Sequence, residues 1–299
     1  MIQQLICGDK VLDLSSAVVM GVLNVTPDSF SDGGRFVTLD AALQQTELMI
    51  NEGALIIDIG AESTRPQAQH VSEQQELDRL LPVLEAVKKR FDVIVSIDSS
   101  SPQVITESAK LGAGLINDVR ALQREGALAA AAQTNLPICL MHMQGQPQTM
   151  QFCLMHMQGQ PQTMQLQPAY ESVVDEVKHF LLERLEACSQ SGIVKERLLI
   201  DVGFGFGKTL AHNLQLLAQL SSFKSLGCPI LVGMSRKSML GALLGDAPVE
   251  QRLFAGLSSA TIAALNGAKI IRTHDVKATF DALAVVNALA ALGENNNVA

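Results

Sequence analysis

Residues 54–100 read ALIIDIGAESTRPQAQHVSEQQELDRLLPVLEAVKKRFDVIVSIDSS and contain the clearest structural pattern in the chain. Two short apolar runs, Leu55–Ile59 and Val93–Ile97, enclose a longer segment whose apolar residues recur at helical spacing. Strands that are apolar throughout, rather than alternating, are typical of a parallel sheet covered on both faces. The stretch therefore predicts one strand–helix–strand unit.

The same unit recurs along the whole chain of 299 residues. The predicted strands number eight: Ala17–Leu23, Leu55–Ile59, Val93–Ile97, Leu115–Asn117, Ile138–Met141, Leu198–Ile200, Ile230–Val232 and Ile270–Arg272. Eight such units with no linker between them predict an α/β fold, a single (β/α)8 TIM barrel in one domain over residues 1–299. A doubly wound open sheet is the alternative, but Gly21–Asn24 does not supply the GxGxxG turn expected after its first strand.

Several predicted helices carry start signals. Ser72 and Gln75 form a capping-box pattern before Glu76–Arg90. Pro102 occupies a first helical position before residues 103–111. Two further helices are expected to begin at polar caps: Thr38 or Asp40 before residues 41–52, and Asp275 before residues 276–292.

Composition and charge exclude several classes of function. The formal net charge of −8 disfavours nonspecific binding to nucleic acid or to an anionic membrane, which requires a basic surface. No apolar run approaches the roughly 18 residues that span a bilayer, and the N-terminus lacks a secretory signal pattern. The five cysteines are scattered and odd in number, which favours a reducing compartment. We therefore expect a soluble, cytoplasmic protein.

One segment of the chain is repeated in tandem. ICLMHMQGQPQTMQ (Ile138–Gln151) is followed at once by FCLMHMQGQPQTMQ (Phe152–Gln165), and only the first residue differs. Two copies that then stop indicate a local duplication rather than a solenoid. Because a short loop leads from the preceding helix into the first copy, we expect that copy to form the fifth strand. The second copy is then expected in the connection after the strand, on the catalytic face, although the reverse assignment stays open.

Polar side chains lie at the carboxyl end of every predicted strand. In a (β/α)8 barrel these ends share one rim, where active sites are built. Any one of these residues alone is more simply a helix cap or a turn residue, but all eight strand ends are polar. They include Asn24, Asp58, Asp98, Asn117, His142, Asp201, Ser235 and Arg272.

The rim residues are of two chemical kinds. Asp98, Asn117 and Asp201 are short groups suited to a flat heterocycle with amide and amino edges. Basic groups suited to an anion are Arg65, Arg236, Lys237, Arg272 and His274. The segment from Arg272 to Asp275 also opens a helix, whose free N–H groups favour phosphate. The pattern predicts a polar heterocycle bound beside a phosphate or pyrophosphate.

Four motifs resemble those of the dihydropteroate synthases. They are GVLNVTPDSFSDGG (residues 21–34), GALIIDIGAESTRP (53–66), GFGFGK (203–208) and GMSRKS (233–238). The motifs are long, specific in combination, and spread over nearly the whole chain. The resemblance implies a (β/α)8 transferase of folate biosynthesis. This enzyme joins 6-hydroxymethyl-7,8-dihydropterin pyrophosphate to 4-aminobenzoate, giving 7,8-dihydropteroate and pyrophosphate.

The resemblance also assigns residues to roles. The residues expected to be catalytic are Asp98, Asp201 and Lys237. The residues expected to contact the pterin are Asp98, Asn117, Met141, Asp201, Gly233 and Lys237. Pyrophosphate is expected at Asn24, Thr64, Arg65, Arg272 and His274, with Asn24 contacting a Mg²⁺ that accompanies it. Aminobenzoate is expected at Thr64, Pro66, Phe204, Lys237 and Ser238. Sulfonamides are the implied inhibitors, and a homodimer is the implied assembly.

The chain departs from the family pattern in three places. Val202 and Ser99 replace the usual Pro and Thr, and we expect small effects. The repeat is the larger departure, because the family has one such segment and either Met141 or Met155 could take the place of its first Met beside the pterin. One hypothesis is that the extra copy changes discrimination against sulfonamides; the alternative is a tolerated loop insertion.

Two other functions would use a similar barrel. A methyltransferase acting on methyltetrahydrofolate would share the pterin-holding residues, but it would not need Ser235–Ser238 together with Arg272 and His274. A noncatalytic pterin-binding protein would be expected to lose Lys237 or an aspartate of the ring site. All of these residues are present, but the duplication leaves the noncatalytic alternative open.

Overall fold

The structure is a computed structural model that describes residues 2–25, 35–62, 71–144 and 168–295. Eight parallel strands form a closed barrel in the order β10-β3-β4-β5-β6-β7-β8-β9. Their bounds are β3 Val18–Asn24, β4 Ile56–Gly60, β5 Ile94–Asp98, β6 Leu115–Asp118, β7 Ile138–Met141, β8 Leu198–Asp201, β9 Ile230–Val232 and β10 Ala268–Thr273. Each predicted strand is confirmed to within a few residues, and the (β/α)8 prediction is confirmed.

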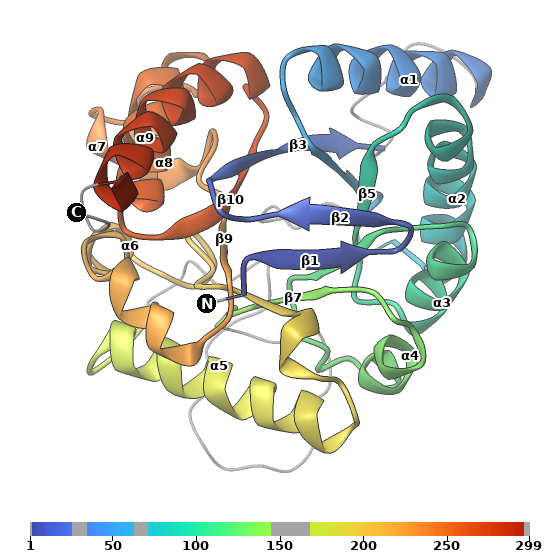
Figure 1. The fold of residues 1–299 in the computed structure, drawn as a ribbon, viewed down its shortest axis with the longest axis horizontal. Helices are drawn as coiled ribbons and strands as arrows, with labels where there is room; N and C mark the ends of the chain where they lie inside the picture. The colour runs from blue at the N-terminus through green and yellow to red at the C-terminus, as the bar shows by residue number, and fades with distance from the viewer. Residues whose placement is uncertain (1, 26–34, 63–70, 145–167, 296–299) are drawn as a thin grey trace.

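Helices surround the barrel as a ring (Figure 1). Their bounds are α1 Arg35–Asn51, α2 Glu73–Arg90, α3 Pro102–Lys110, α4 Ala127–Gln133, α5 Val173–Gln190, α6 Leu210–Ala218, α7 Ser238–Leu243, α8 Leu253–Leu265 and α9 Val276–Asn295. Short 3-10 segments are η2 Lys195–Arg197, η3 Leu220–Leu226 and η4 Val249–Gln251. None of the helices in the described part of the chain is both long and apolar enough to cross a membrane.

The predicted helix starts are mostly confirmed. Ser72 and Gln75 exchange the two hydrogen bonds of a capping box, and Pro102 is the first residue of α3. The start of α1 was predicted wrongly: the helix begins at Arg35, so Thr38 and Asp40 lie inside it. The residues directly after Gly34 include no glycine or proline that would prevent a helix, so the helix can begin before Thr38. Helix α9 begins after Asp275 as expected, but the Asp275 carboxylate accepts hydrogen bonds from Arg236.

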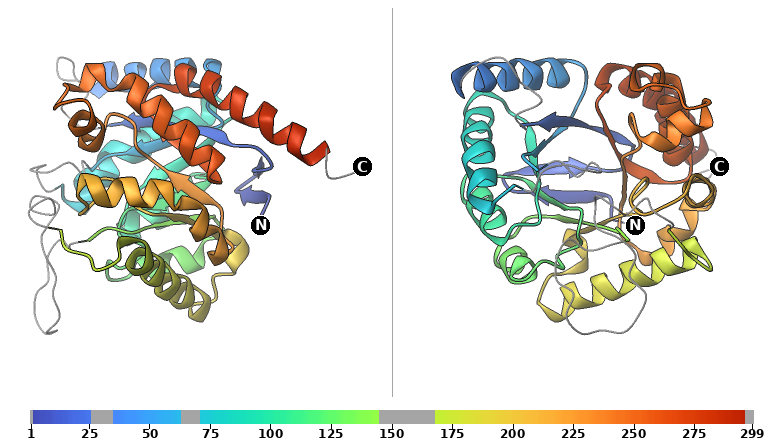
Figure 2. Two further views of the ribbon diagram at one scale, coloured as in Figure 1. Left: turned by 90° about the vertical axis from the view of Figure 1, so that its left-hand side faces the viewer. Right: turned by 180° about the vertical axis from the view of Figure 1, so that it is seen from behind.

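A hairpin that the sequence analysis did not predict closes the amino end of the barrel. Strands β1 (Gln4–Cys7) and β2 (Lys10–Asp13) pair antiparallel around a turn at Gly8. Figure 1 shows the hairpin crossing in front of the barrel, and in Figure 2 it lies at the same end of the molecule as the end of α9. Its inward side chains, Leu5, Cys7, Leu12 and Leu14, are buried.

These hairpin residues complete a plug of apolar side chains inside the barrel. Each barrel strand contributes at least one inward residue to it: Val18, Met20, Ile56, Ile94, Leu115, Cys139, Leu199, Leu231 and Ile270. A larger cluster fills the space between the strands and the helices. The amino-terminal half of the barrel is therefore filled with side chains, and any substrate must bind at the carboxyl ends of the strands.

Candidate active site

The alternation of side chains along each strand carries the polar residues into the barrel mouth. Successive residues of a strand point to opposite faces, so the residue two or four places beyond an inward apolar residue also points inward. Counting from the plug residues gives Asn24, Asp58, Asp98, Asn117, Met141, Asp201, Gly233 and Arg272. The barrel thus brings the predicted pterin residues and Arg272 to one rim.

Arg272 joins two carboxylates across this mouth. Its Nε donates to Oδ2 of Asp58 over 2.6 Å, and its Nη2 donates to Oδ2 of Asp98 over 2.9 Å. The same Asp58 oxygen accepts from Nδ2 of Asn117 over 3.1 Å. Four elements, β4, β5, β6 and β10, are therefore connected by one hydrogen-bonded network around a single guanidinium group.

This network leaves acceptors for a substrate. The second oxygen of Asp58, Oδ1, is buried and has no hydrogen-bond partner among the described residues. Burial raises the pKa of Asp98 to about 7; Arg272 opposes this shift, and Asp58 adds to it. A carboxyl group poised near neutrality, beside an acceptor without a partner, suits a ligand that presents N–H groups.

A second group of residues lies on the other side of the mouth. Oδ1 of Asp201 accepts from the backbone N–H of Gly203 over 2.8 Å, and Nζ of Lys237 donates to the backbone carbonyl of Phe204 over 2.5 Å. Burial raises the pKa of Asp201, while Lys237 opposes the shift. Burial lowers the pKa of Lys237 to about 8, and Asp201 is the main group opposing it.

The two groups form one electrostatic unit. The positive charge of Arg272 lowers the pKa of Lys237 and also acts on Asp201, so the network around Arg272 and the pair Asp201–Lys237 are near enough to influence each other. The charged groups on the two sides of the mouth therefore act on one another's pKa values.

The side chains of the β8–α6 loop differ from expectation at Phe204. Phe204 is fully buried in the core, and only its backbone carbonyl meets Lys237. Phe206 is half-buried, and Nζ of Lys237 lies 4.4 Å from the centre of its ring. Phe206 is thus the aromatic side chain of this loop that can face a substrate. Both residues belong to the GFGFGK motif, whose sequence alone does not say which ring points inward.

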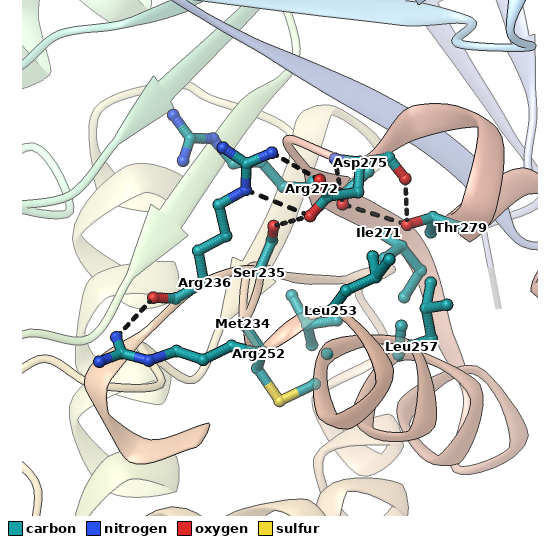
Figure 3. A pocket seen from close by; sticks show the side chains of 14 residues that line it. Met234, Ser235, Arg236, Arg252, Leu253, Leu257, Ile271, Arg272, Asp275 and Thr279 are labelled. Carbon is teal, nitrogen blue, oxygen red and sulfur yellow. Dashed lines mark hydrogen bonds and ion pairs between the residues drawn. The ribbon is translucent and has the colours of Figure 1, made fainter. Parts of the chain in front are cut away.

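Arg236, one of the expected anion-binding groups, is engaged by the protein itself (Figure 3). Its guanidinium pairs with the Asp275 carboxylate, with Nη2 and Oδ1 2.5 Å apart, and its carbonyl accepts from Nη1 of Arg252. Arg236 has a φ of 62°, a left-handed conformation that is uncommon for a residue with a side chain. Lys237 follows this strained turn, and its side chain points back to the β8–α6 loop, where it contacts Phe204.

The cavity beside this turn is too small for a substrate. It holds about 10 Å³, roughly the space of one water molecule. Ser235 lines it, and its Oγ lies 3.1 Å from Nδ1 of His274 and accepts from the His274 backbone N–H. His274 is thereby held directly before α9.

Several residues that support the site had no predicted role. Glu62 accepts two hydrogen bonds of 3.1 Å from Arg120, which also donates to Ser100. Asp58 was predicted as a rim residue without a ligand, and Lys208 was noted only as part of the GFGFGK motif. The inward orientation of Asp58 could have been predicted, because it lies two residues beyond Ile56 and so on the same face of the strand.

Some expected site residues lie outside the described part of the chain. Thr64, Arg65 and Pro66 fall there, as do Met155 and the rest of the second repeat copy. The first copy forms β7 from Ile138 to Met141, as predicted, and Met141 is buried at the mouth. Ser238 begins α7, directly after Lys237.

Comparison with known proteins identifies the family. A family pattern described as "Pterin binding enzyme" matches residues 20–153 and 149–274. The two matches overlap inside the repeat, as expected if the family pattern contains one copy of that segment. Dihydropteroate synthase of Escherichia coli (strain K12) is 54% identical over 95% of both chains, and that of Haemophilus influenzae is 53% identical over 96% of this chain and 99% of its own.

Solved structures agree in fold. A Yersinia pestis dihydropteroate synthase in a sulfonamide drug complex is 53% identical, with a TM-score of 0.87 over 96% of this chain and 99% of that chain. A Xanthomonas albilineans dihydropteroate synthase with 4-aminobenzoic acid is 43% identical, with a TM-score of 0.87 over 97% and 99%. The present chain therefore belongs to the pterin-binding enzymes and, among them, to the dihydropteroate synthases.

Proposed function

We propose that the barrel mouth condenses 6-hydroxymethyl-7,8-dihydropterin pyrophosphate with 4-aminobenzoate, giving 7,8-dihydropteroate and pyrophosphate. The observation that carries the proposal is the position of Arg272, which lies between Asp58 and Asp98 in a network influenced by Asp201 and Lys237. This arrangement offers acceptors to a heterocycle and positive charge to its leaving group. No observation favours the methyltransferase or the noncatalytic alternative.

The pterin ring is assigned to the carboxylates and amide of the mouth. Asp98, Asn117 and Asp201 present acceptors and a donor to the N–H and carbonyl edges of the ring, with Met141 and Gly233 beside it. When pyrophosphate leaves, the ring system gains positive charge, which the nearby carboxylates stabilise. Asp98, Asp201 and Lys237 are therefore the proposed catalytic residues.

The pyrophosphate is assigned to the cationic side of the mouth. Arg272 and His274 are placed to meet it, with Thr64 and Arg65 proposed from the family motif. The start of α9 follows His274 directly, and free N–H groups at a helix start favour anions. If the leaving group binds Arg272, the guanidinium must share its donors between the pyrophosphate and the two carboxylates.

Mg²⁺ fits this site as a companion of the pyrophosphate. Among the described residues, no group of three or more His, Cys, Asp or Glu side chains is arranged to hold a metal ion. Asn24 ends β3 at the mouth and offers a single amide oxygen. Mg²⁺ prefers oxygen ligands and keeps several waters, so one protein ligand suffices when phosphate oxygens supply others. The ion would neutralise charge that develops on the leaving group.

The aminobenzoate is assigned to the rim beside Lys237 and Ser238, with Thr64 and Pro66 proposed from the motif. Phe204 was expected here, but its buried side chain leaves this role to Phe206. The neutral aromatic amine attacks the pterin methylene, so no covalent enzyme intermediate is required. Because a related enzyme is solved in a sulfonamide complex, sulfonamides are proposed to compete for this place.

The assembly is proposed to be a homodimer formed through α8 and α9. These helices expose large apolar side chains: Phe254, which is 78% exposed, and Ile262, Leu265, Phe280, Val285, Leu289 and Leu292. An apolar surface of this kind is typical of a protein interface.

A cytoplasmic location is also proposed, because Cys7, Cys139, Cys188 and Cys228 are free thiols. We further propose that residues 1–299 form one domain, with the repeat as an insertion.

The proposed reaction is tested by a coupled assay for pyrophosphate release. Release is expected only when both substrates and Mg²⁺ are present, and 7,8-dihydropteroate should form in equal amount. Release that needs no 4-aminobenzoate would exclude the condensation. Transfer of a methyl group from methyltetrahydrofolate would favour the methyltransferase instead.

A further inference from the structure

Lys208 is a buried lysine that the proposed mechanism does not use. Its residue is only 2% exposed, at the end of the β8–α6 loop. Nζ donates to the carbonyl of Gly203 over 2.9 Å and to the carbonyl of Phe206 over 3.0 Å, and it lies 2.9 Å from Nδ1 of His142. An ammonium group has three N–H donors, so all of them are used within the protein.

The loop that Lys208 binds is folded tightly around it. Gly203, Gly205 and Gly207 have φ values of 71°, 79° and 61°, all in the left-handed region. A Cβ atom on Gly203 would lie 1.8 Å from the carbonyl oxygen of His142, so the loop rests directly on the end of β7. The loop cannot shift toward β7, and its carbonyl groups at Gly203 and Phe206 point to Lys208.

The same loop holds the two ring-site residues of this side of the mouth. Between the two carbonyls bound by Lys208 lies that of Phe204, which accepts from Lys237. The N–H of Gly203 donates to Asp201. The backbone of residues 203–206 is therefore shared between two lysines and one aspartate, and its conformation fixes all three side chains.

We propose that Lys208 is a positioning residue of the ring site: its buried ammonium group holds residues 203–207 so that their backbone aligns Asp201 and Lys237. The proposal rests on the proposed function, because the reaction defines what the alignment serves. It identifies a cation that acts through the loop and does not touch the substrate.

The three contacts of Nζ, with two backbone carbonyls and with Nδ1 of His142, suit an ammonium group that donates to all of them. Burial lowers the pKa of Lys208 to about 7, and Asp201 opposes the shift. Burial and the charge of Lys208 lower the pKa of His142 well below its usual value. With Lys208 as the donor, as proposed, His142 accepts at Nδ1 and carries its proton on Nε2. A methionine would fill the same volume without desolvating a charge, so the lysine is best explained by its donors.

The kinetic test compares Lys208→Met with the wild type and with Lys110→Met, an exposed lysine paired with Glu107. With dihydropterin pyrophosphate varied, Lys208→Met is expected to lose about a hundredfold in kcat/KM per folded molecule. Its melting temperature should stay within a few degrees of wild type, and Lys110→Met should stay within twofold in kcat/KM. If folded Lys208→Met keeps wild-type kcat/KM, the positioning role is wrong, while the proposed function still stands on the wild-type activity.

A second pair of variants covers the case in which Lys208→Met does not fold. His142→Asn keeps an acceptor near the position of Nδ1, whereas His142→Leu removes it. We expect His142→Asn to stay within threefold of wild type and His142→Leu to lose about tenfold in kcat/KM. In the wild type, ¹⁵N NMR should show His142 with its proton on Nε2. Equal kcat/KM for the two variants, or a proton on Nδ1, would overturn the inference.

Discussion

Nη2 of Arg272 donates to Oδ2 of Asp98 over 2.9 Å, across the carboxyl ends of two strands that are not neighbours in the barrel. The same guanidinium donates to Asp58, so it is a bridge between two carboxylates before any substrate binds. Arg272 therefore has two roles: it pairs with Asp58 and Asp98 in the folded protein, and it is proposed to bind the substrate.

Replacing Arg272 by methionine is expected to harm both activity and stability. Without the guanidinium, Asp58 and Asp98 become unpaired buried carboxylates, which should cost about 2–4 kcal/mol of unfolding free energy. Loss of a cation from the leaving-group side should lower kcat/KM about a hundredfold or more. Denaturant unfolding and the pyrophosphate assay measure the two effects. Arg90→Met, at the exposed end of α2, is the control and should change neither.

The pH dependence of the reaction should reflect Asp98. Because burial raises its pKa to about 7, the carboxylate form dominates only above that pH, and kcat/KM for the pterin substrate should rise with pH through about 7. Lys237, with a pKa lowered to about 8, should cause a decline at higher pH. Asp98→Asn should abolish the acidic limb and leave the basic one. A profile with an unchanged acidic limb in Asp98→Asn would assign that limb to another group.

Glu76 should limit stability at alkaline pH. It is 3% exposed, its Oε1 has no partner among the described residues, and burial raises its pKa to about 7. Between the ordinary pKa of 4.5 and the raised value of about 7, the folded state binds more protons than the unfolded state, so stability is lost as pH rises from 4.5 through 7 and stays low above it. Glu76→Gln should gain roughly 2–3 kcal/mol at pH 8 and less than about 1 kcal/mol at pH 5. Glu85→Gln, exposed on the same helix, should show no such pH-dependent gain.

Two glycines separate backbone strain from close contact. Gly203 and Gly192 both have positive φ, at 71° and 83°, but no atom lies within 4 Å of a Cβ built on Gly192. Gly192→Ala should therefore cost only the strain of a left-handed alanine, about 1 kcal/mol. Gly203→Ala adds a collision with the carbonyl of His142 and should cost more than about 3 kcal/mol. Equal losses in denaturant unfolding would mean that β7 and the loop separate easily.

Deleting Phe152–Gln165 tests what the second repeat copy does. Gln144 and Ala169, which lie before and after this segment in the sequence, are hydrogen-bonded: Nε2 of Gln144 donates to the carbonyl of Ala169 over 3.3 Å. The deletion should therefore preserve the barrel and keep kcat within about threefold, since loop length has a small entropic cost. If the copy affects inhibitor discrimination, the ratio of the sulfonamide inhibition constant to the aminobenzoate KM will change. An unchanged ratio would establish a tolerated insertion.

Much of the fold could be predicted because the signals are local. Each strand is a short apolar run, and most helix starts carry capping residues, so the eight units and their order follow from the sequence. The period of two then carries Asp98, Asn117, Asp201 and Arg272 into one mouth. The hairpin Gln4–Asp13 was not predicted, because its two short strands alternate in exposure and resemble a loop in composition.

The supporting contacts could not be predicted, because they join residues far apart in sequence. Lys208 meets His142 across 66 positions, and Arg120 meets Glu62 across 58. Nothing local to a charged residue indicates which distant carbonyl or carboxylate it will bind. The choice between Phe204 and Phe206 fails for a related reason: both follow a glycine, and only the turn geometry decides which ring is buried.

Whether one mouth binds both parts of the substrate is tested by calorimetry. The affinities of Arg272→Met and Asp201→Asn are measured for dihydropterin pyrophosphate and for the same pterin without its pyrophosphate. If one mouth holds both parts of the substrate, Asp201→Asn will weaken both compounds about equally. Arg272→Met will then weaken the pyrophosphate compound at least about tenfold more than the bare pterin. Equal weakening of both compounds by Arg272→Met would contradict the assignment of the departing diphosphate to this arginine.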